Sequence, residues 1–266
     1  MSRLASAVRR SAGLVRLDRP VDVRDRIEGG GVRRSFFLCA TPRSGSNLLA
    51  RLLASTQLVG LAGERFNHHE LPGWAYARPG AYLVECAKDA RGTSVLGLKL
   101  HWDQVEPFLG LLRRLRGVGG LSDRELVERV FPEPTFVWLR REDEVAQGVS
   151  WWKAKTSGAW LGGRAGRREP WFDFDEIDTR IRRVREHNDA WARWFAANRL
   201  DPLPITYEEV AADPVRAVER VLVHLGLDAP ADLAIEPRTQ RQADDVNREW
   251  IDRYLELARV NSGHTT

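Results

Sequence analysis

The stretch FFLCATPRSGSNLLARLL, residues 36–53, passes from an apolar run through a short polar loop into a helical pattern. A loop that joins a buried strand to a helix exposes free backbone N–H groups at the positive end of the helix dipole, which suits an anion. Gly45 lets the backbone approach that anion, and Arg43 supplies a bidentate positive charge. The other side-chain donors of the loop are Ser44, Ser46 and Asn47. The stretch predicts a phosphate-binding turn, although an ordinary capped strand-to-helix turn has the same local features.

The loop departs from the phosphate loop of nucleotide-hydrolysing enzymes. That motif reads G-x-x-x-x-G-K-[ST], and both its first glycine and its lysine are missing here. A phosphotransferase of this class therefore stays an alternative and is not the leading hypothesis.

The surrounding pattern predicts an α/β fold. Four apolar runs are expected to form buried strands, at residues 35–40, 95–100, 135–139 and 203–206. Helical patterns are expected at residues 47–55, 103–116, 122–129, 143–155, 174–198 and 214–225. Strands separated by helices indicate a central parallel sheet with helices on both faces, and ligands then bind at the carboxyl ends of the strands.

Length and charge limit the possible partners. The 266 residues, 43% hydrophobic, are enough for one large domain, which we place at residues 35–266 after a basic, flexible arm at residues 1–34. The net charge of +4 is spread along the chain without basic blocks, so an anionic small molecule is favoured over nucleic acid.

Cysteine usage and hydropathy indicate a cytoplasmic protein. Cys39 and Cys86 have no metal-site spacing and form no disulfide framework, which fits a reducing compartment. No run of about 18 apolar residues is present, so we expect no membrane span.

Five segments in order carry a family resemblance. They are CATPRSGSNLLARLLASTQLVGLAGE, GLKLHWDQ, FVWLRREDEVAQGVSWWKA, WARWFAANRLDPLPITYEEV and QRQADDVNREWIDRYLE, within residues 35–256. Together they resemble the bacterial sulfotransferases that use 3'-phosphoadenosine 5'-phosphosulfate (PAPS), a family typified by trehalose 2-sulfotransferase. The resemblance implies the P-loop-like sulfotransferase fold, sulfuryl transfer to a hydroxyl of a carbohydrate or glycosylated metabolite without a metal, and a homodimer.

The resemblance also implies cofactor-binding residues. The 5'-phosphate and bridging oxygen of PAPS would be held by Arg43, Ser44, Gly45, Ser46 and Asn47. The 3'-phosphate would be held by Arg141 and Ser150, with Arg140 as the alternative, because the pair leaves the register open by one residue.

Further residues of the cofactor site come from the later segments. Tyr207 matches the tyrosine that such enzymes place against the adenine, and Arg241 and Gln242 match a segment that closes over the 3'-phosphate side. Trp250 is expected to pack that segment against the domain.

The catalytic residues are expected around a second strand end. Lys99 and Arg43 suit neutralisation of the charge that develops on the leaving oxygen. In the trehalose-type enzymes a glutamate in a segment resembling G-x-P-x-E-F acts as the base, and the position matched to it here is Asn67, which cannot accept a proton.

Three substitutes for that base are available. His101 reproduces, with Lys99, the K-x-H spacing that places the base in animal-type cytosolic sulfotransferases, and neutral histidine suits proton transfer near pH 7. We take His101 as the base, with Glu64 as its rival and His68 or His69 third. A non-catalytic nucleotide-binding relative is the remaining alternative.

Acceptor recognition is expected near several tryptophans. The glycine- and arginine-rich segment 156–171 predicts a lid that selects the acceptor. Tryptophans near the expected site, whose faces can stack on sugars, are Trp102, Trp151, Trp152 and Trp160.

Overall fold

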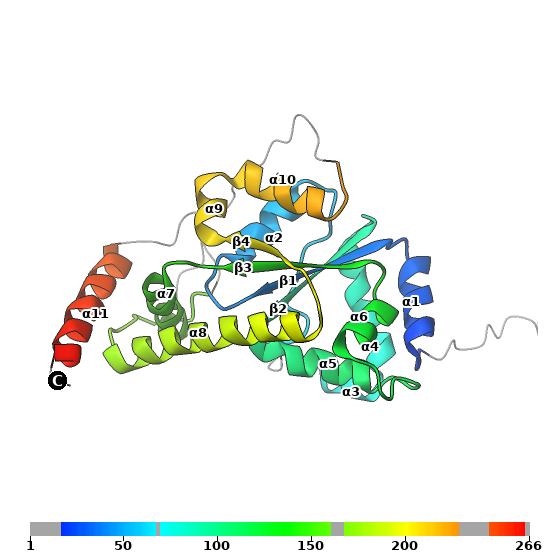
Figure 1. Cartoon of the computed structure of the whole chain (residues 1–266), viewed down its shortest axis with the longest axis horizontal. Coiled ribbons are helices and arrows are strands. Elements are labelled where there is room, and N and C mark those ends of the chain that lie inside the picture. The colour runs from blue at the N-terminus through cyan, green and yellow to red at the C-terminus, as the bar shows by residue number, and fades with distance from the viewer. Residues whose placement is uncertain (1–16, 68–69, 161–167, 229–244, 264–266) are drawn as a thin grey trace, which may run out of the picture.

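The central element is a four-stranded parallel sheet (Figure 1). The computed structural model describes residues 17–67, 70–160, 168–228 and 245–263. The strands are β1 (Arg34–Ala40), β2 (Val95–His101), β3 (Pro134–Arg140) and β4 (Leu203–Thr206), in the order β2-β1-β3-β4. All three pairings are parallel, which confirms the predicted strands and the α/β fold class.

Helices cover both faces of the sheet. Their bounds are α1 (Pro20–Gly29), α2 (Ser46–Ser55), α3 (Gly73–Ala77), α4 (Pro79–Ala87), α5 (Val105–Arg113), α6 (Asp123–Val130), α7 (Glu144–Ser157), α8 (Phe174–Ala197), α9 (Tyr207–Ala212), α10 (Pro214–His224) and α11 (Asp245–Gly263). Short 3-10 helices are η1 (Lys88–Ala90) and η2 (Trp102–Gln104). The helix predicted at residues 103–116 thus begins as η2 and continues as α5.

The two faces have separate cores. On one face, Phe37 of β1 packs with Phe108 of α5 and Phe131 beside α6, at ring-centroid distances of 5.5 and 5.3 Å. On the other face, Leu38 belongs to a cluster with residues of α2 and α10, which lie together above the sheet in Figure 1. Strand β1 is buried from Ser35 onward, and its apolar run suits its position inside the sheet between β2 and β3.

Helix α1 corrects part of the expected N-terminal arm. Val23 and Ile27, four residues apart on one helix face, are 0% and 1% exposed and join the core cluster of Phe37. Arg24 fixes the helix from its polar side by donating to the carbonyl oxygen of Glu128 at 2.9 Å. The arm therefore does not extend through α1, and residues 1–16 of it lie outside the described residues.

A pair of substitutions in α1 tests this docking. Ile27→Ala removes a side chain buried at 1% exposure and should lower the free energy of unfolding by about 2–4 kcal/mol. Val21→Ala, at a 51% exposed position of the same helix, should stay within about 0.5 kcal/mol of the parent protein. Urea unfolding of the full chain measures both, and equal effects would contradict the docking of α1.

Candidate active site

The loop between β1 and α2 has the shape of a phosphate cradle. Gly45 has φ +90°, and a Cβ at this position would lie 2.6 Å from Cδ2 of Tyr207. The side-chain amide of Gln147, on α7, donates to Oγ1 of Thr41 and to the carbonyl oxygen of Pro42, both at 2.7 Å. The turn thus needs glycine at position 45 and is held by α7 from a neighbouring layer.

Ser44, Ser46 and Asn47 complete this loop. Ser44 and Ser46 are buried, and Oγ of Ser44 has no hydrogen-bond partner in the part of the chain that the structure describes. Asn47 lies in the first turn of α2, where the backbone N–H groups are free. These residues line the turn between β1 and α2, and their binding of a phosphate stays a prediction.

Arg43 links the cradle to α7. Its Nε donates to Oγ of Ser150 at 3.1 Å and its Nη1 donates to the carbonyl oxygen of Trp160 at 2.6 Å. Burial, together with the nearby positive charge of Arg141, lowers the pKa of Arg43 from its ordinary value. Two guanidinium groups thus lie close together, an arrangement that an anion between them would stabilise.

The geometry separates the two arginines at the end of β3. The guanidinium of Arg141 lies 4.7 Å from the ring centroid of Tyr207, and its buried Nε has no partner among the described residues. Arg140 instead lies over the ring of Trp138 at 4.6 Å and is exposed. Arg141, and not Arg140, therefore joins Arg43, Ser150 and Tyr207.

A buried ion pair lies at the carboxyl end of β2. Lys99 is 2% exposed, and its Nζ lies 2.9 Å from Oε1 of Glu64. The same ammonium donates to Oδ1 of Asn47 in the first turn of α2. Glu64 reaches this position because its segment runs parallel to β2, with the Lys99 N–H donating to the carbonyl oxygen of Gly63 at 3.0 Å.

Glu64 is held as a carboxylate. Burial raises its pKa, but the charges of His101 and Lys99 and hydrogen bonds from Lys99 and Gln104 outweigh burial and lower the pKa to about 2. The bond from Nε2 of Gln104 to Oε2 of Glu64 is 3.2 Å long. Gln104 is a positioning residue of the site that sequence reasoning missed.

His101 lies on the other side of that carboxylate. Its Nδ1 is 3.9 Å from Oε2 of Glu64, and its buried Nε2 has no hydrogen-bond partner among the residues that the structure describes. Burial lowers the pKa of His101 below 6.5, with Lys99 acting in the same direction and Glu64 in the opposite one. The imidazole is thus neutral near pH 7, the form that can accept a proton.

Of the remaining predicted residues, Asn67 and Trp250 are described by the structure and four others are not. Asn67 lies in a turn, where its carbonyl oxygen accepts from the N–H groups of Glu70 and Leu71, and it is Glu64 that forms the ion pair with Lys99. Predicted residues that lie outside the described residues are His68, His69, Arg241 and Gln242. Trp250 packs in a cluster with Val149 and Ile177, as expected of a residue that anchors the C-terminal segment.

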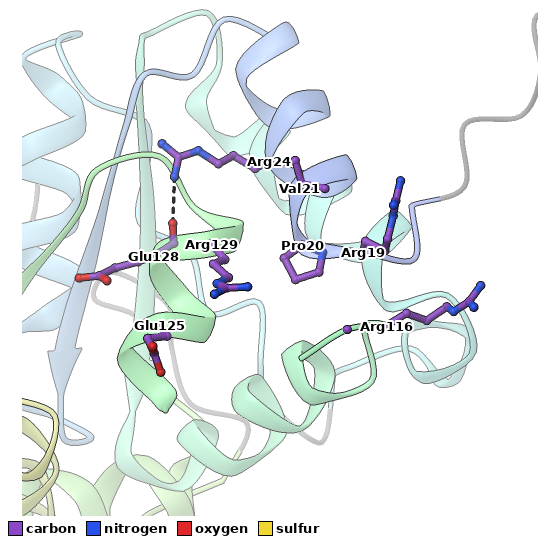
Figure 2. A pocket seen from close by; sticks show the side chains of 9 residues that line it. Arg19, Pro20, Val21, Arg24, Arg116, Glu125, Glu128 and Arg129 are labelled. Atoms are coloured by element: carbon purple, nitrogen blue, oxygen red, sulfur yellow. Dashed lines mark hydrogen bonds between the residues drawn. The ribbon is translucent and has the colours of Figure 1, made fainter. Parts of the chain in front are cut away.

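A hollow elsewhere on the surface differs from this site. It has a volume of about 420 Å³ and lies between α1 and α6, beside the amino ends of the strands (Figure 2). Several of its charged groups are used within the protein: Arg19 pairs with Asp22, and Arg24 binds Glu28 and the backbone of Glu128. We therefore place the functional site at the carboxyl ends of the strands.

The described ranges contain neither a candidate metal cluster nor a candidate membrane span. These residues contain no group of three or more His, Cys, Asp or Glu side chains arranged to hold a metal. None of the helices in this part of the chain combines the length and apolar character that a bilayer crossing requires.

Comparison with known proteins gives a family and two relatives. The family model described as Stf0 sulphotransferase matches residues 35–256. The chain is 29% identical over 253 residues to a trehalose 2-sulfotransferase of Mycobacterium tuberculosis (strain ATCC 35801 / TMC 107 / Erdman), covering 83% of this chain and 94% of the relative. It is 27% identical over 258 residues to a trehalose 2-sulfotransferase of Mycolicibacterium smegmatis (strain ATCC 700084 / mc(2)155), with the same coverage of both chains.

Solved structures are also similar. A sulfotransferase domain from the curacin biosynthetic pathway matches with a TM-score of 0.45 and 14% identity, over 80% of this chain and 81% of that domain. A sulfotransferase domain from the Synechococcus PCC 7002 olefin synthase matches with a TM-score of 0.41 and 17% identity, over 81% of both chains.

The ion pair of Lys99 and Glu64 gives a prediction for stability. The lowered pKa of Glu64 stabilises the fold above pH about 4.5, and this contribution, on the order of 3 kcal/mol, is lost as the pH falls toward about 2. Glu64→Gln should therefore lower the free energy of unfolding at pH 7 by about 2–4 kcal/mol, since it also leaves Lys99 buried without its anion. The difference from the parent should shrink between pH 5 and pH 3.

Urea unfolding at several pH values measures this difference. The control is Glu106→Gln, because the side chain of Glu106 is 83% exposed and its contact with Arg113 is worth less than about 1 kcal/mol. A Glu64→Gln protein with full stability at pH 7 would show that the ion pair does not hold the site together.

Proposed function

The chain belongs to the Stf0 sulphotransferase family, and from this premise we propose that it transfers a sulfuryl group from PAPS to a hydroxyl of a carbohydrate or glycosylated metabolite. One observation carries the proposal: Arg43 in the cradle, Arg141 directly after β3 and the buried Lys99 of β2 lie around the carboxyl ends of adjacent parallel strands. The names of the two mycobacterial relatives support a sugar as the acceptor.

The cradle fits the 5'-phosphosulfate of the donor. In our proposal the backbone N–H groups around Gly45 and the side chains of Ser44, Ser46 and Asn47 bind it, and Arg43 turns from Trp160 toward it. Oγ of Ser44 supports this assignment, because it has no partner in the ranges that the structure describes and a buried hydroxyl without a partner is costly.

A second anion site fits the 3'-phosphate. Arg141 has a buried Nε without a partner in the described residues, and Ser150 lies within reach of the same arginine pair. Tyr207 holds Arg141 through a cation–π contact and is the aromatic surface that this site offers to the adenine. From the sequence resemblance, Arg241 and Gln242 remain proposed to close over the 3'-phosphate side.

Charge on the leaving oxygen is neutralised by two residues. The acceptor oxygen attacks sulfur while the bond from sulfur to the bridging oxygen breaks, and negative charge develops on that oxygen. Arg43 is part of the cradle and Lys99 donates to Asn47 within it, and the low exposure of Lys99, 2%, strengthens its field. Neither step requires a metal.

His101 accepts the proton of the acceptor hydroxyl in this proposal. Nε2 of its neutral imidazole has no hydrogen-bond partner among the described residues, and the carboxylate of Glu64 near Nδ1 stabilises the imidazolium that forms. Glu64 is the rival base, although a carboxylate with a pKa of about 2 attracts a proton weakly.

Acceptor selection by segment 156–171 and the homodimer remain predictions. The contact from Arg43 to Trp160 supports the first, because it joins the start of this segment to the cradle.

Binding of 3',5'-ADP tests the donor site. The protein should bind this nucleotide tightly without Mg²⁺, and Arg141→Ala should weaken binding about 10- to 100-fold through loss of charge-assisted hydrogen bonds. Arg140→Ala is the matched control, because Arg140 lies over Trp138 and should leave the affinity unchanged. Calorimetry measures both, and preference for Mg-ATP would favour a phosphotransferase instead.

The pH dependence of kcat/KM tests the base. A base must be deprotonated, so the rate should fall as the pH falls through the pKa of His101, with a midpoint below 6.5. His101→Ala should lower kcat about 10²- to 10⁴-fold. If Glu64 were the base, the rate would stay level down to about pH 4, since the pKa of this carboxyl is about 2.

Labelled PAPS and a panel of sugars that includes trehalose provide the assay. His224→Gln is the control, because His224 binds the carbonyl oxygen of Phe136 within the domain. Binding of 3',5'-ADP without any transfer to the panel would favour the non-catalytic alternative. Near-normal turnover by His101→Ala would remove His101 as the base.

A further inference from the structure

Helix α8 carries a buried histidine that none of the proposed roles uses. His187 is 7% exposed, and its Nδ1 has no hydrogen-bond partner in the described part of the chain. An unpaired polar group in an interior costs free energy unless a ligand or water pairs with it.

The position of His187 on α8 follows from the topology. The Nε1 of Trp191, one turn later on the same face, donates to the carbonyl oxygen of Ala40 at 3.0 Å, at the carboxyl end of β1. Since α8 ends at Ala197 and leads to the amino end of β4, the helix runs back along the sheet (Figure 1). His187 therefore lies beyond the carboxyl ends of the strands, on the side of the cradle.

The aromatic residues near His187 adjoin residues of the candidate active site in sequence. Its ring centroid lies 6.5 Å from that of Trp151, which directly follows Ser150 on α7. Trp102, next to His101, packs against Trp191 at a centroid distance of 5.2 Å. Asp103 acts electrostatically on both histidines, so η2 lies near each of them.

The chemistry of this corner suits a neutral polyol. Burial lowers the pKa of His187. The charge of Arg183 lowers it further, and the charge of Asp103 raises it by less than burial lowers it, so the ring is neutral near pH 7. A neutral imidazole exchanges hydrogen bonds with hydroxyls in either direction. Trp151, with Arg180 at 5.9 Å from its centroid, is a half-buried aromatic surface of the kind that packs on the C–H face of a sugar.

We infer that His187 and Trp151 form the acceptor subsite, in which Nδ1 of His187 binds a sugar hydroxyl other than the one that is sulfated. The inference rests on the proposed function and adds residues that choose the acceptor. The two histidines then have different roles: His101 accepts the proton of the acceptor hydroxyl, and His187 positions the acceptor.

Kinetics of the full chain test the subsite. The probe is the sugar of the panel, which includes trehalose and glucose, that the parent protein sulfates fastest. His187→Ala should raise KM for this sugar about tenfold, the effect of one lost hydrogen bond to a buried group, and leave KM for PAPS unchanged. His187→Gln, which keeps a polar atom, should recover part of the loss.

Two controls distinguish a loss of sugar binding from a change in the fold. Asp189→Asn changes an exposed residue in the same turn of α8 and should leave both KM values unchanged. The melting temperature with and without 3',5'-ADP should be the same for His187→Gln as for the parent. As a second readout, adding the sugar without PAPS should shift the imidazole nitrogen signals of His187 in NMR spectra, assigned by their absence from His187→Gln.

The possible outcomes distinguish a failure of the acceptor subsite from a failure of the proposed function. An unchanged KM for the sugar in both His187 variants, with unshifted imidazole signals, overturns the subsite while sulfation stands. Equal increases of KM for the sugar and for PAPS also overturn it, because they indicate a structural role. A parent protein that sulfates none of the sugars contradicts the proposed function itself.

Discussion

The burial of Lys99 is the constraint on which the site depends. An ammonium group at 2% exposure needs an anion and further hydrogen-bond acceptors, and the fold supplies them through Glu64 and Asn47. These contacts connect β2, the segment after α2 and the first turn of α2 at one point. The segment can supply the anion because Gly60 and Gly63 hydrogen-bond to β2 along its edge. His101, two residues further along β2, then lies beside the same carboxylate.

Local patterns predicted the parts of the site that local geometry determines. The strand, loop and helix around Gly45 are contiguous in sequence, so their pattern gave the cradle, and the parallel sheet placed it beside Lys99. The sequence alone could not decide which of Arg140 and Arg141 would hold the 3'-phosphate. Neighbouring residues at a strand end point to opposite sides, and only the position of Tyr207 shows which side is the site.

The sequence analysis failed for residues whose positions depend on contacts with segments far away in sequence. The family glutamate was matched to Asn67, whereas the residue that pairs with Lys99 is Glu64, three positions earlier in the same segment. The backbone pairing of Gly63 with β2 places Glu64 there, and the sequence pattern does not show this pairing. Helix α1 was missed because arginine and aspartate alternate around Val23 and Ile27, and only contact with α6 reveals their shared buried face.

The distribution of charge explains how one site can serve two unlike substrates. Arg43 in the cradle and Arg141 directly after β3 lie beside α7 and α9, where the proposed donor carries its phosphates. Toward α8 the rings of His187 and Trp151 suit the proposed sugar, and Arg180 and Arg183 of α8 add positive charge close to these rings. Lys99, Glu64 and His101 lie at the boundary, where the sulfuryl group would change partners.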